Sequence, residues 1–128
     1  DWKAHYNRGN LLAGKGDLGK AIIEYREALK INPDHARTHN NLGVVLIRQG
    51  KLKDAIGHYS EAVRLNPNFP EAHYNLGRAL AEQGDLKDAM EHYAEAVKIR
   101  PGYSKALRDL EKLKRRAKES VNADGSIN

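Results

Sequence analysis

Six histidines are the side chains in this 128-residue sequence best suited to chemistry, since imidazole binds metals and transfers protons near neutral pH. His5, His39 and His73 recur at one fixed interval, and the same interval separates His58 from His92. Zinc ligands must all lie about 2 Å from one ion, whereas stacked helical units lie roughly 10 Å apart. A periodic row cannot converge on one point, so we predict no metal site.

No other set of residues has the spacing of a catalytic centre. The chain has no cysteine, which excludes disulfides, thiolate nucleophiles and cysteine-based metal sites. Ser60 and Ser104 lack a histidine and an acid at the spacing of a triad. Asp54 and Asp88 are expected near helix starts, where a negative charge is favourable. We therefore predict that the chain is not an enzyme and needs no cofactor.

The interval between the histidines also separates many other identical residues. They form the trios Asn7, Asn41 and Asn75; Gly9, Gly43 and Gly77; Gly16, Gly50 and Gly84; Ala21, Ala55 and Ala89; Tyr25, Tyr59 and Tyr93; Ala28, Ala62 and Ala96; and Pro33, Pro67 and Pro101. Such self-similarity is typical of repeat proteins, in which each repeat is one supersecondary unit. The glycines therefore mark positions in a repeat and do not form a phosphate-binding loop.

Within each repeat the apolar and small residues follow a helical period. In the second repeat Leu42, Gly43 and Leu46 share one face of a first helix, and Ala55 and Tyr59 share one face of a second. In an antiparallel hairpin we expect Gly43 to face Ala55, because two small residues let helix axes approach closely.

Glycine and proline mark the ends of these helices. Gly50 lies between them, where a helix can end in a left-handed residue at little cost. Pro67 ends the second helix, because proline lacks an N–H and forces the preceding residue out of helical geometry. Each repeat is thus expected to be a helix, a short turn, a second helix and a stop.

This pattern of small, aromatic and proline positions resembles the tetratricopeptide repeat (TPR), whose unit is about 34 residues long. The first repeat departs from it at Arg8, where the others have Leu42 and Leu76. The resemblance implies an all-α, right-handed α-solenoid of three helix-turn-helix hairpins with a capping helix. The expected boundaries are a TPR domain at 1–119, with repeats 2–35, 36–69 and 70–103 and the capping helix 104–119, followed by a disordered tail at 120–128.

The capping helix is the most basic part of the chain. Of the net charge of +5, residues 104–128 supply +3 from seven Lys or Arg against four Asp or Glu. Leu107, Leu110 and Leu113 form its apolar side, and its cations are expected to solvate the end of the solenoid.

The resemblance also implies that the first helices line a concave peptide-binding groove. The residues expected to point into it are Lys3, Tyr6, Asn7, Asn10, Arg37, Asn40, Asn41, Val44, Arg48, Glu71, Tyr74, Asn75, Arg78 and Lys105. Tyrosine rings supply contact area at a low cost in entropy, and asparagine both donates to and accepts from a peptide backbone. The asparagine row is similar to the one with which O-GlcNAc transferase repeats grip peptides. Alternatively, these amides hydrogen-bond to neighbouring helices.

A narrower resemblance fails at its charged positions. TPR domains that bind chaperone C-terminal tails use a carboxylate clamp of Lys, Asn and Arg. Asn10 and Asn41 match its asparagines, but Tyr6, Glu71 and Asn75 stand at the cationic places. A terminal carboxylate would lose its charge-assisted partners there, so we do not predict a clamp.

The sequence thus predicts a scaffold or adaptor that binds a protein or peptide segment in its groove. Self-association as a homo-oligomer, through the end or convex faces, is the main alternative. Nucleic-acid binding by the basic helix is less favoured, because a solubilising cap explains those cations. Trp2 stands at a position where later repeats have small residues. We expect either that this end of the array docks against a neighbour or that the Trp2 ring folds back and covers Ala4 and Leu11.

The sequence does not place the chain in a compartment. No apolar run approaches the roughly 18 residues that would span a membrane, so we predict no direct membrane partner. The lack of cysteine suits the cytoplasm and the periplasm equally.

Overall fold

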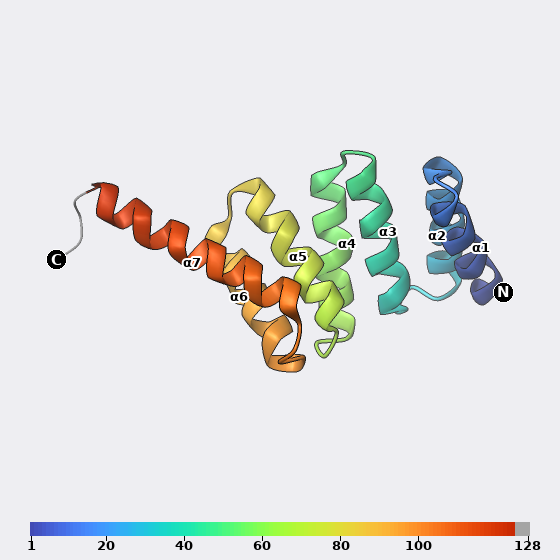
Figure 1. Ribbon diagram of the computed structural model, residues 1–128. Helices are drawn as coiled ribbons and strands as arrows, with labels where there is room; N and C mark the ends of the chain where they lie inside the picture. Colours follow the sequence, from blue (N-terminus) through green and yellow to red (C-terminus); the bar gives the residue numbers. More distant parts are fainter. Residues whose placement is uncertain (125–128) are drawn as a thin grey trace.

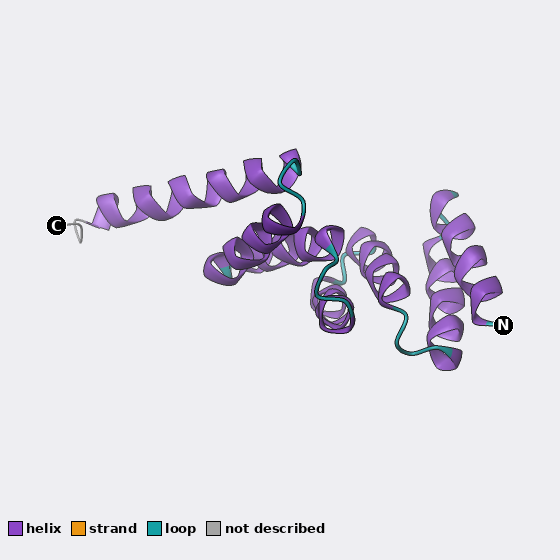
Figure 2. Ribbon diagram, turned by 90° about the horizontal axis from the view of Figure 1, so that it is seen from below, coloured by secondary structure: helices purple, strands orange, loops and turns teal. Residues whose placement is uncertain are grey.

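The computed structural model describes residues 1–124, which form seven α-helices and no strand (Figure 1). The helices are α1 (Trp2–Gly14), α2 (Leu18–Ile31), α3 (Ala36–Arg48), α4 (Leu52–Leu65), α5 (Pro70–Gln83), α6 (Leu86–Ile99) and α7 (Ser104–Asp124). The first helix of each hairpin begins at the first residue of an expected repeat. Three hairpins follow one another, and α1 and α7 lie at opposite ends of the array in both views (Figures 1 and 2).

Each hairpin turns at a glycine in the left-handed region of backbone conformation. Gly16, Gly50 and Gly84 have φ angles of 82°, 77° and 97°, and no other residue in the described range has a positive φ. Glycine has no Cβ and adopts this conformation readily. After Gly50, the Lys51 N–H donates to the Leu46 carbonyl oxygen at 2.9 Å, which closes the end of α3.

The two helices of a hairpin meet where a glycine lies under a tyrosine ring. A Cβ added to Gly43 would lie 2.6 Å from the Tyr59 ring, so the ring lies against the α3 backbone. Gly43 was expected to face Ala55, and the structure adds that the Tyr59 ring makes the nearest contacts with this glycine. Gly77 is approached by both the Tyr93 ring and the Ala89 carbonyl oxygen.

The buried apolar residues form clusters that extend along the array, the largest from α2 to α5 and another from α5 to α7. Leu42 and Leu46 are fully buried between the first and second hairpins. At the other end, Ala106, Leu110 and Leu113 of α7 pack with buried residues of α5 and α6. Helix α7 therefore covers the third hairpin, as a fourth first helix would.

Helix α7 is longer than the expected capping helix. It continues through residues 120–124, which were expected to be disordered, instead of ending at 119. No glycine or proline interrupts the segment from Ser104 to Asp124, so nothing in the backbone stops the helix. The rest of the expected tail, 125–128, lies outside the described residues.

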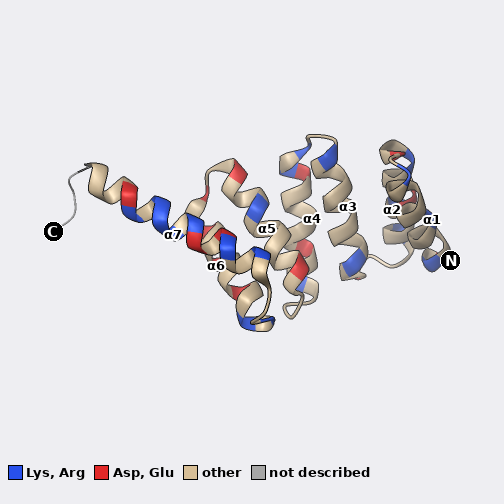
Figure 3. Ribbon diagram, in the orientation of Figure 1, with Lys and Arg blue, Asp and Glu red and all other residues tan. Residues whose placement is uncertain are grey.

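The far half of α7 extends away from the other helices (Figures 1 and 2). Charged residues of both signs are interspersed along it (Figure 3). Among the described residues, no helix is both long and apolar enough to cross a lipid bilayer.

Candidate functional site

The expected groove residues lie on the first helices α1, α3 and α5 and on α7. We call this surface the first-helix face. Seven of its residues are exposed and available for contact, namely Lys3, Asn7, Arg37, Val44, Arg48, Arg78 and Lys105. Arg37 lies over the Phe69 ring, with its guanidinium 5.3 Å from the ring centre, and Arg48 donates to the Ala13 carbonyl oxygen at 3.0 Å.

The amides between the first two hairpins bind neighbouring helices. Asn10 Oδ1 accepts hydrogen bonds from the Tyr25 hydroxyl at 2.6 Å and from Asn41 Nδ2 at 3.0 Å. Asn41 also approaches the Tyr6 hydroxyl at 3.4 Å. Asn10 and Asn41 therefore join α1, α2 and α3 in one network, in agreement with the alternative interpretation of the asparagine row.

We call the contact between the first and second hairpins the first junction and that between the second and third hairpins the second junction. The second junction has different hydrogen bonds. Val44 stands where the first repeat has Asn10, and Asn75 Nδ2 donates to Asn40 Oδ1 at 3.0 Å instead. Asn40 is buried, so it does not offer the open amide that the groove prediction assigned to it.

Tyr74 is also buried, which contradicts its expected role as an open contact. Its hydroxyl donates to Asp109 of α7 at 2.8 Å, and its ring centre lies 5.3 Å from that of Tyr103. Burial first, and then the bond with Asp109, raises the pKa of Tyr74 to about 12, so the hydroxyl stays protonated. This contact was not predicted, because α7 was expected to cap the array and to contribute only Lys105 to the groove.

The negative charge of Glu71 is paired with the positive charge of a residue in the same repeat. Arg100 lies 2.6 Å from its carboxylate and also stacks over Tyr103. Burial alone would raise the pKa of Glu71, but the hydrogen bond from Arg100, a backbone hydrogen bond and the charges of Arg100 and Arg37 together lower it. Glu71 is thus a paired anion at the place where a carboxylate clamp needs a cation.

Trp2 and Tyr6 both pack on His35, which lies just before α3. The Trp2 and His35 ring centres are 4.4 Å apart, and Tyr6 meets the imidazole edge-on at 5.0 Å. Trp2 therefore does not cover Leu11, whose side chain remains 60% exposed.

The histidines form pairs across each of the last two hairpins. His39 Nδ1 and His58 Nδ1 are 3.1 Å apart, and His73 and His92 have the same arrangement. These pairs were not predicted, because equivalent histidines of different repeats lie far apart, whereas the two histidines of a pair belong to the two helices of one hairpin. Two imidazoles do not complete a metal site, and the described residues contain no group of three or more His, Cys, Asp or Glu that could hold an ion.

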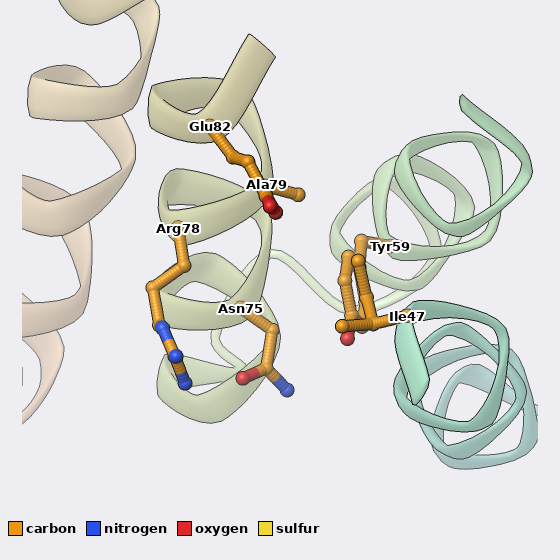
Figure 4. A pocket seen from close by; sticks show the side chains of 6 residues that line it. All are labelled: Ile47, Tyr59, Asn75, Arg78, Ala79 and Glu82. Carbon is orange, nitrogen blue, oxygen red and sulfur yellow. The ribbon is translucent and has the colours of Figure 1, made fainter. Parts of the chain in front are cut away.

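A pocket opens on the first-helix face between α3, α4 and α5 (Figure 4). Its volume is about 290 Å³, and it is lined by Ile47, Tyr59, Asn75, Arg78, Ala79 and Glu82. Asn75 and Arg78 were expected groove residues, whereas Ile47, Tyr59 and Ala79 were assigned to the core or left out. In the sequence, the signal for this pocket is Val44, which occupies in the second repeat the position that Asn10 has in the first.

Helical hairpins repeated at one fixed interval, with a glycine under a tyrosine in each, define an α-helical repeat protein. The chain belongs to the tetratricopeptide repeat family. A family profile described as "Tetratricopeptide repeat" matches residues 40–104, half of the chain, and one described as "TPR repeat" matches residues 9–50. Both matches confirm the resemblance and the all-α solenoid.

Solved structures with the same fold include three of particular similarity. The MamA protein superposes with a TM-score of 0.85 at 26% identity, covering 91% of this chain and 63% of that one. The first TPR of Spaghetti (RPAP3), bound to the HSP90 peptide SRMEEVD, gives 0.87 at 22% identity over 91% and 92%. The Sgt2 TPR domain from Aspergillus fumigatus gives 0.87 at 24% identity over 94% and 82%. Because the last two structures are less than 25% identical to this chain, they show that the fold is shared and nothing more.

A search of curated proteins gave no match.

Proposed function

We propose that this chain is a protein-interaction module, without catalytic activity, that binds a segment of a partner protein along the first-helix face. The observation that carries the proposal is a row of exposed polar side chains that continues across all three repeats and onto α7. The solved structure of the Spaghetti TPR with an HSP90 peptide supports it by analogy, because that protein has the same fold.

The charge on this face favours an acidic partner. Lys3, Arg37, Arg48, Arg78 and Lys105 are exposed cations of the expected site, and its anion Glu71 is paired with Arg100. Glu82, beside the pocket, is an exposed anion on the same face, so cations still outnumber anions there. Charge complementarity of this kind steers association and suppresses wrong partners. No clamp geometry is required, because the cations are spread along the face.

The test is a selection of peptides from a random displayed library against the intact chain. Selected peptides are then measured against a variant with Lys3, Arg37 and Arg78 changed to Ala. The matched control changes Arg26, Lys53 and Lys87, which are exposed cations on the second helices, so that the same charge is removed. We expect affinity to fall by about tenfold or more in the first variant, which is about 1.4 kcal/mol. Equal losses in both variants would show that the face is not the binding surface.

Self-association is a second candidate, favoured by apolar side chains on the first hairpin. Leu11, Ile23 and Ile31 are 60%, 59% and 53% exposed there, more than any other large apolar residue described. Exposed apolar side chains that form a contiguous patch are typical of interaction surfaces. A concentration-dependent mass in sedimentation equilibrium that disappears in a Leu11→Glu, Ile23→Glu variant would support a homo-oligomer. A monomeric parent at high concentration would exclude it.

A further inference from the structure

The pocket between α3, α4 and α5 lacks a hydrogen-bond acceptor that the preceding junction contains. At the first junction, Asn10 Oδ1 accepts from the Tyr25 hydroxyl at 2.6 Å and from Asn41 Nδ2 at 3.0 Å. Val44 occupies the equivalent place in the second repeat. A valine side chain accepts no hydrogen bond, so two donors of the second junction meet no equivalent oxygen.

The first of these donors is the Tyr59 hydroxyl. Tyr59 is 3% exposed, and its hydroxyl has no hydrogen-bond partner among the described residues. No fully buried polar side-chain atom in the same range lacks a partner, so this oxygen must reach open space, and Tyr59 lines the pocket. Burial raises the pKa of Tyr59 to about 12, so the hydroxyl keeps its proton and remains a donor.

The second donor is the Asn75 amide. One hydrogen of Asn75 Nδ2 is used in the bond to Asn40 Oδ1, and a carboxamide nitrogen carries two. Figure 4 shows Asn75 on the opposite side of the pocket from Tyr59 and Ile47. An oxygen between the two would be placed as Asn10 Oδ1 is at the first junction.

The remaining walls limit the kind of group that fits. Ile47 and Ala79 are apolar, while Arg78 and Glu82 bring one charge of each sign. The volume of about 290 Å³ exceeds by far the roughly 30 Å³ of one water, so an amino-acid side chain fits. A carboxylate would have acceptors only and would face Glu82, whereas a carboxamide has an N–H₂ group to donate to it.

We infer that this pocket is a subsite for a glutamine or asparagine side chain of the partner, which takes the place that Asn10 takes at the first junction. The inference rests on the proposed function and adds the chemistry of one ligand residue. The ligand oxygen accepts from the Tyr59 hydroxyl and from Asn75, and its nitrogen donates to Glu82.

The test uses capped tripeptides, acetyl-Gly-Gln-Gly-amide and its counterparts with Glu or Leu at the centre. Each is titrated into the isotope-labelled intact chain, and the NMR signal of the Asn75 side-chain amide is followed. We expect the Gln peptide to shift this signal with a Kd at least about threefold lower than either counterpart, as one or two added hydrogen bonds imply. Tighter binding of the Glu peptide would overturn the carboxamide assignment.

Two variants locate the effect. Val44→Asn places the protein's own amide at the second junction and should weaken binding of the Gln peptide by about tenfold. Val121→Asn is the matched control, because Val121 and Val44 are 41% and 38% exposed. Tyr59→Phe removes a hydroxyl that has no hydrogen-bond partner in the part of the chain that the structure describes. This variant should therefore fold normally, and it should also weaken binding of the Gln peptide.

Each outcome separates the subsite from the proposed function. No shift at Asn75, or a shift that survives both Val44→Asn and Tyr59→Phe, overturns the subsite. If library-selected peptides still require the cations of the first-helix face, the function stands without the subsite. A third outcome is that library-selected peptides do not require these cations, while the Gln peptide shifts the Asn75 signal in the parent but not in Val44→Asn or Tyr59→Phe. In that case the subsite stands, and the proposal that the first-helix face binds the partner is wrong.

Discussion

At the scale of single residues, each hairpin is organised by a tyrosine ring that lies directly on a glycine. Tyr25, Tyr59 and Tyr93 are almost fully buried, and each ring would be within 2.7 Å of a Cβ added to the glycine beneath it. The glycine therefore creates the space that the ring fills, which sets how closely the two helices pack.

We predict that Gly43→Ala lowers the free energy of unfolding by about 1–3 kcal/mol, because the added methyl group overpacks the contact with Tyr59. Urea unfolding measures the change. Gly57→Ala is the matched control, since Gly57 lies within α4 with nothing near its Cβ position. It should stabilise the chain by about 0.5–1 kcal/mol. Equal effects of the two changes would disprove the overpacking argument.

A second prediction compares the hydroxyls of two equivalent tyrosines. Tyr25→Phe removes the hydrogen bond to Asn10 and should cost about 0.5–1.5 kcal/mol. Tyr59→Phe should leave the free energy of unfolding nearly unchanged, because its hydroxyl has no partner among the described residues. Thermal melts of both variants test this. A large loss in Tyr59→Phe would mean that a bound water or an internal partner already satisfies the oxygen.

At the scale of the helical hairpin, the two helices are also joined by histidine pairs. His39 Nε2 lies 2.9 Å from the Pro33 carbonyl oxygen, which accepts its hydrogen. His39 Nδ1 is then the acceptor for the His58 Nδ1–H. In the first repeat Glu24 replaces the second histidine and lies 2.8 Å from His5 Nδ1.

These pairs predict a loss of stability in mild acid. Burial, and then the neighbouring imidazole, lowers the pKa of His58 and of His92. An unfolded histidine titrates near pH 6.5, so below about that pH the unfolded chain binds more protons than the folded one. The stabilisation is therefore complete above about pH 6.5 and is lost as the pH falls through the lowered folded pKa. Urea unfolding between about pH 7.5 and pH 5 should show a decreasing free energy of unfolding.

The control variant gives the second and third repeats the glutamate that the first repeat has at the position of the second histidine. A His58→Glu, His92→Glu variant removes the two imidazoles whose pKa is lowered and places a carboxylate where the first repeat has Glu24 beside His5. This variant should lose less stability between the same two pH values. If parent and variant lose the same amount, the histidine pairs are not the source of the acid sensitivity.

At the scale of the whole molecule, α7 completes the array by covering the third hairpin. Its buried residues Ala106, Leu110 and Leu113 all lie in its first half, and the Asp109 carboxylate binds the Tyr74 hydroxyl of α5. The second half extends beyond the body of the protein (Figure 2). The two halves therefore differ in what they contribute to stability.

We predict that truncation after Tyr103 destabilises the chain and promotes aggregation, because it exposes the apolar surface of α5 and α6. Truncation after Glu119 keeps all the buried residues of α7 and should leave the melting temperature within about 2 °C of the parent. Light scattering and thermal melts distinguish the two. A soluble, equally stable chain ending at Tyr103 would show that α7 is not a cap.

The sequence by itself determined the helical hairpins, their number and their stacking. The constant repeat interval set where each hairpin begins, and left-handed glycines and helix-ending prolines act within a few residues of their own position. Local backbone chemistry and the helical period of apolar residues carry this information, so no tertiary contact was needed to predict it.

The tertiary structure decided which polar side chains remain free. Asn40 and Tyr74 have the same helical position and were both predicted to be open, yet packing buries them against Asn75 and under α7. Likewise, Val44 reads in the sequence as a neutral replacement for Asn10. Only the packed junction shows that, within residues 1–124, it leaves the Tyr59 hydroxyl beside a pocket with no hydrogen-bond partner. Hydrogen bonds between hairpins depend on which side chain stands at each equivalent position and on how far apart the atoms lie. A repeat can have an acceptor such as Asn10 or an apolar residue such as Val44 at that position without any change in the repeat interval, so the interval does not predict the pairing.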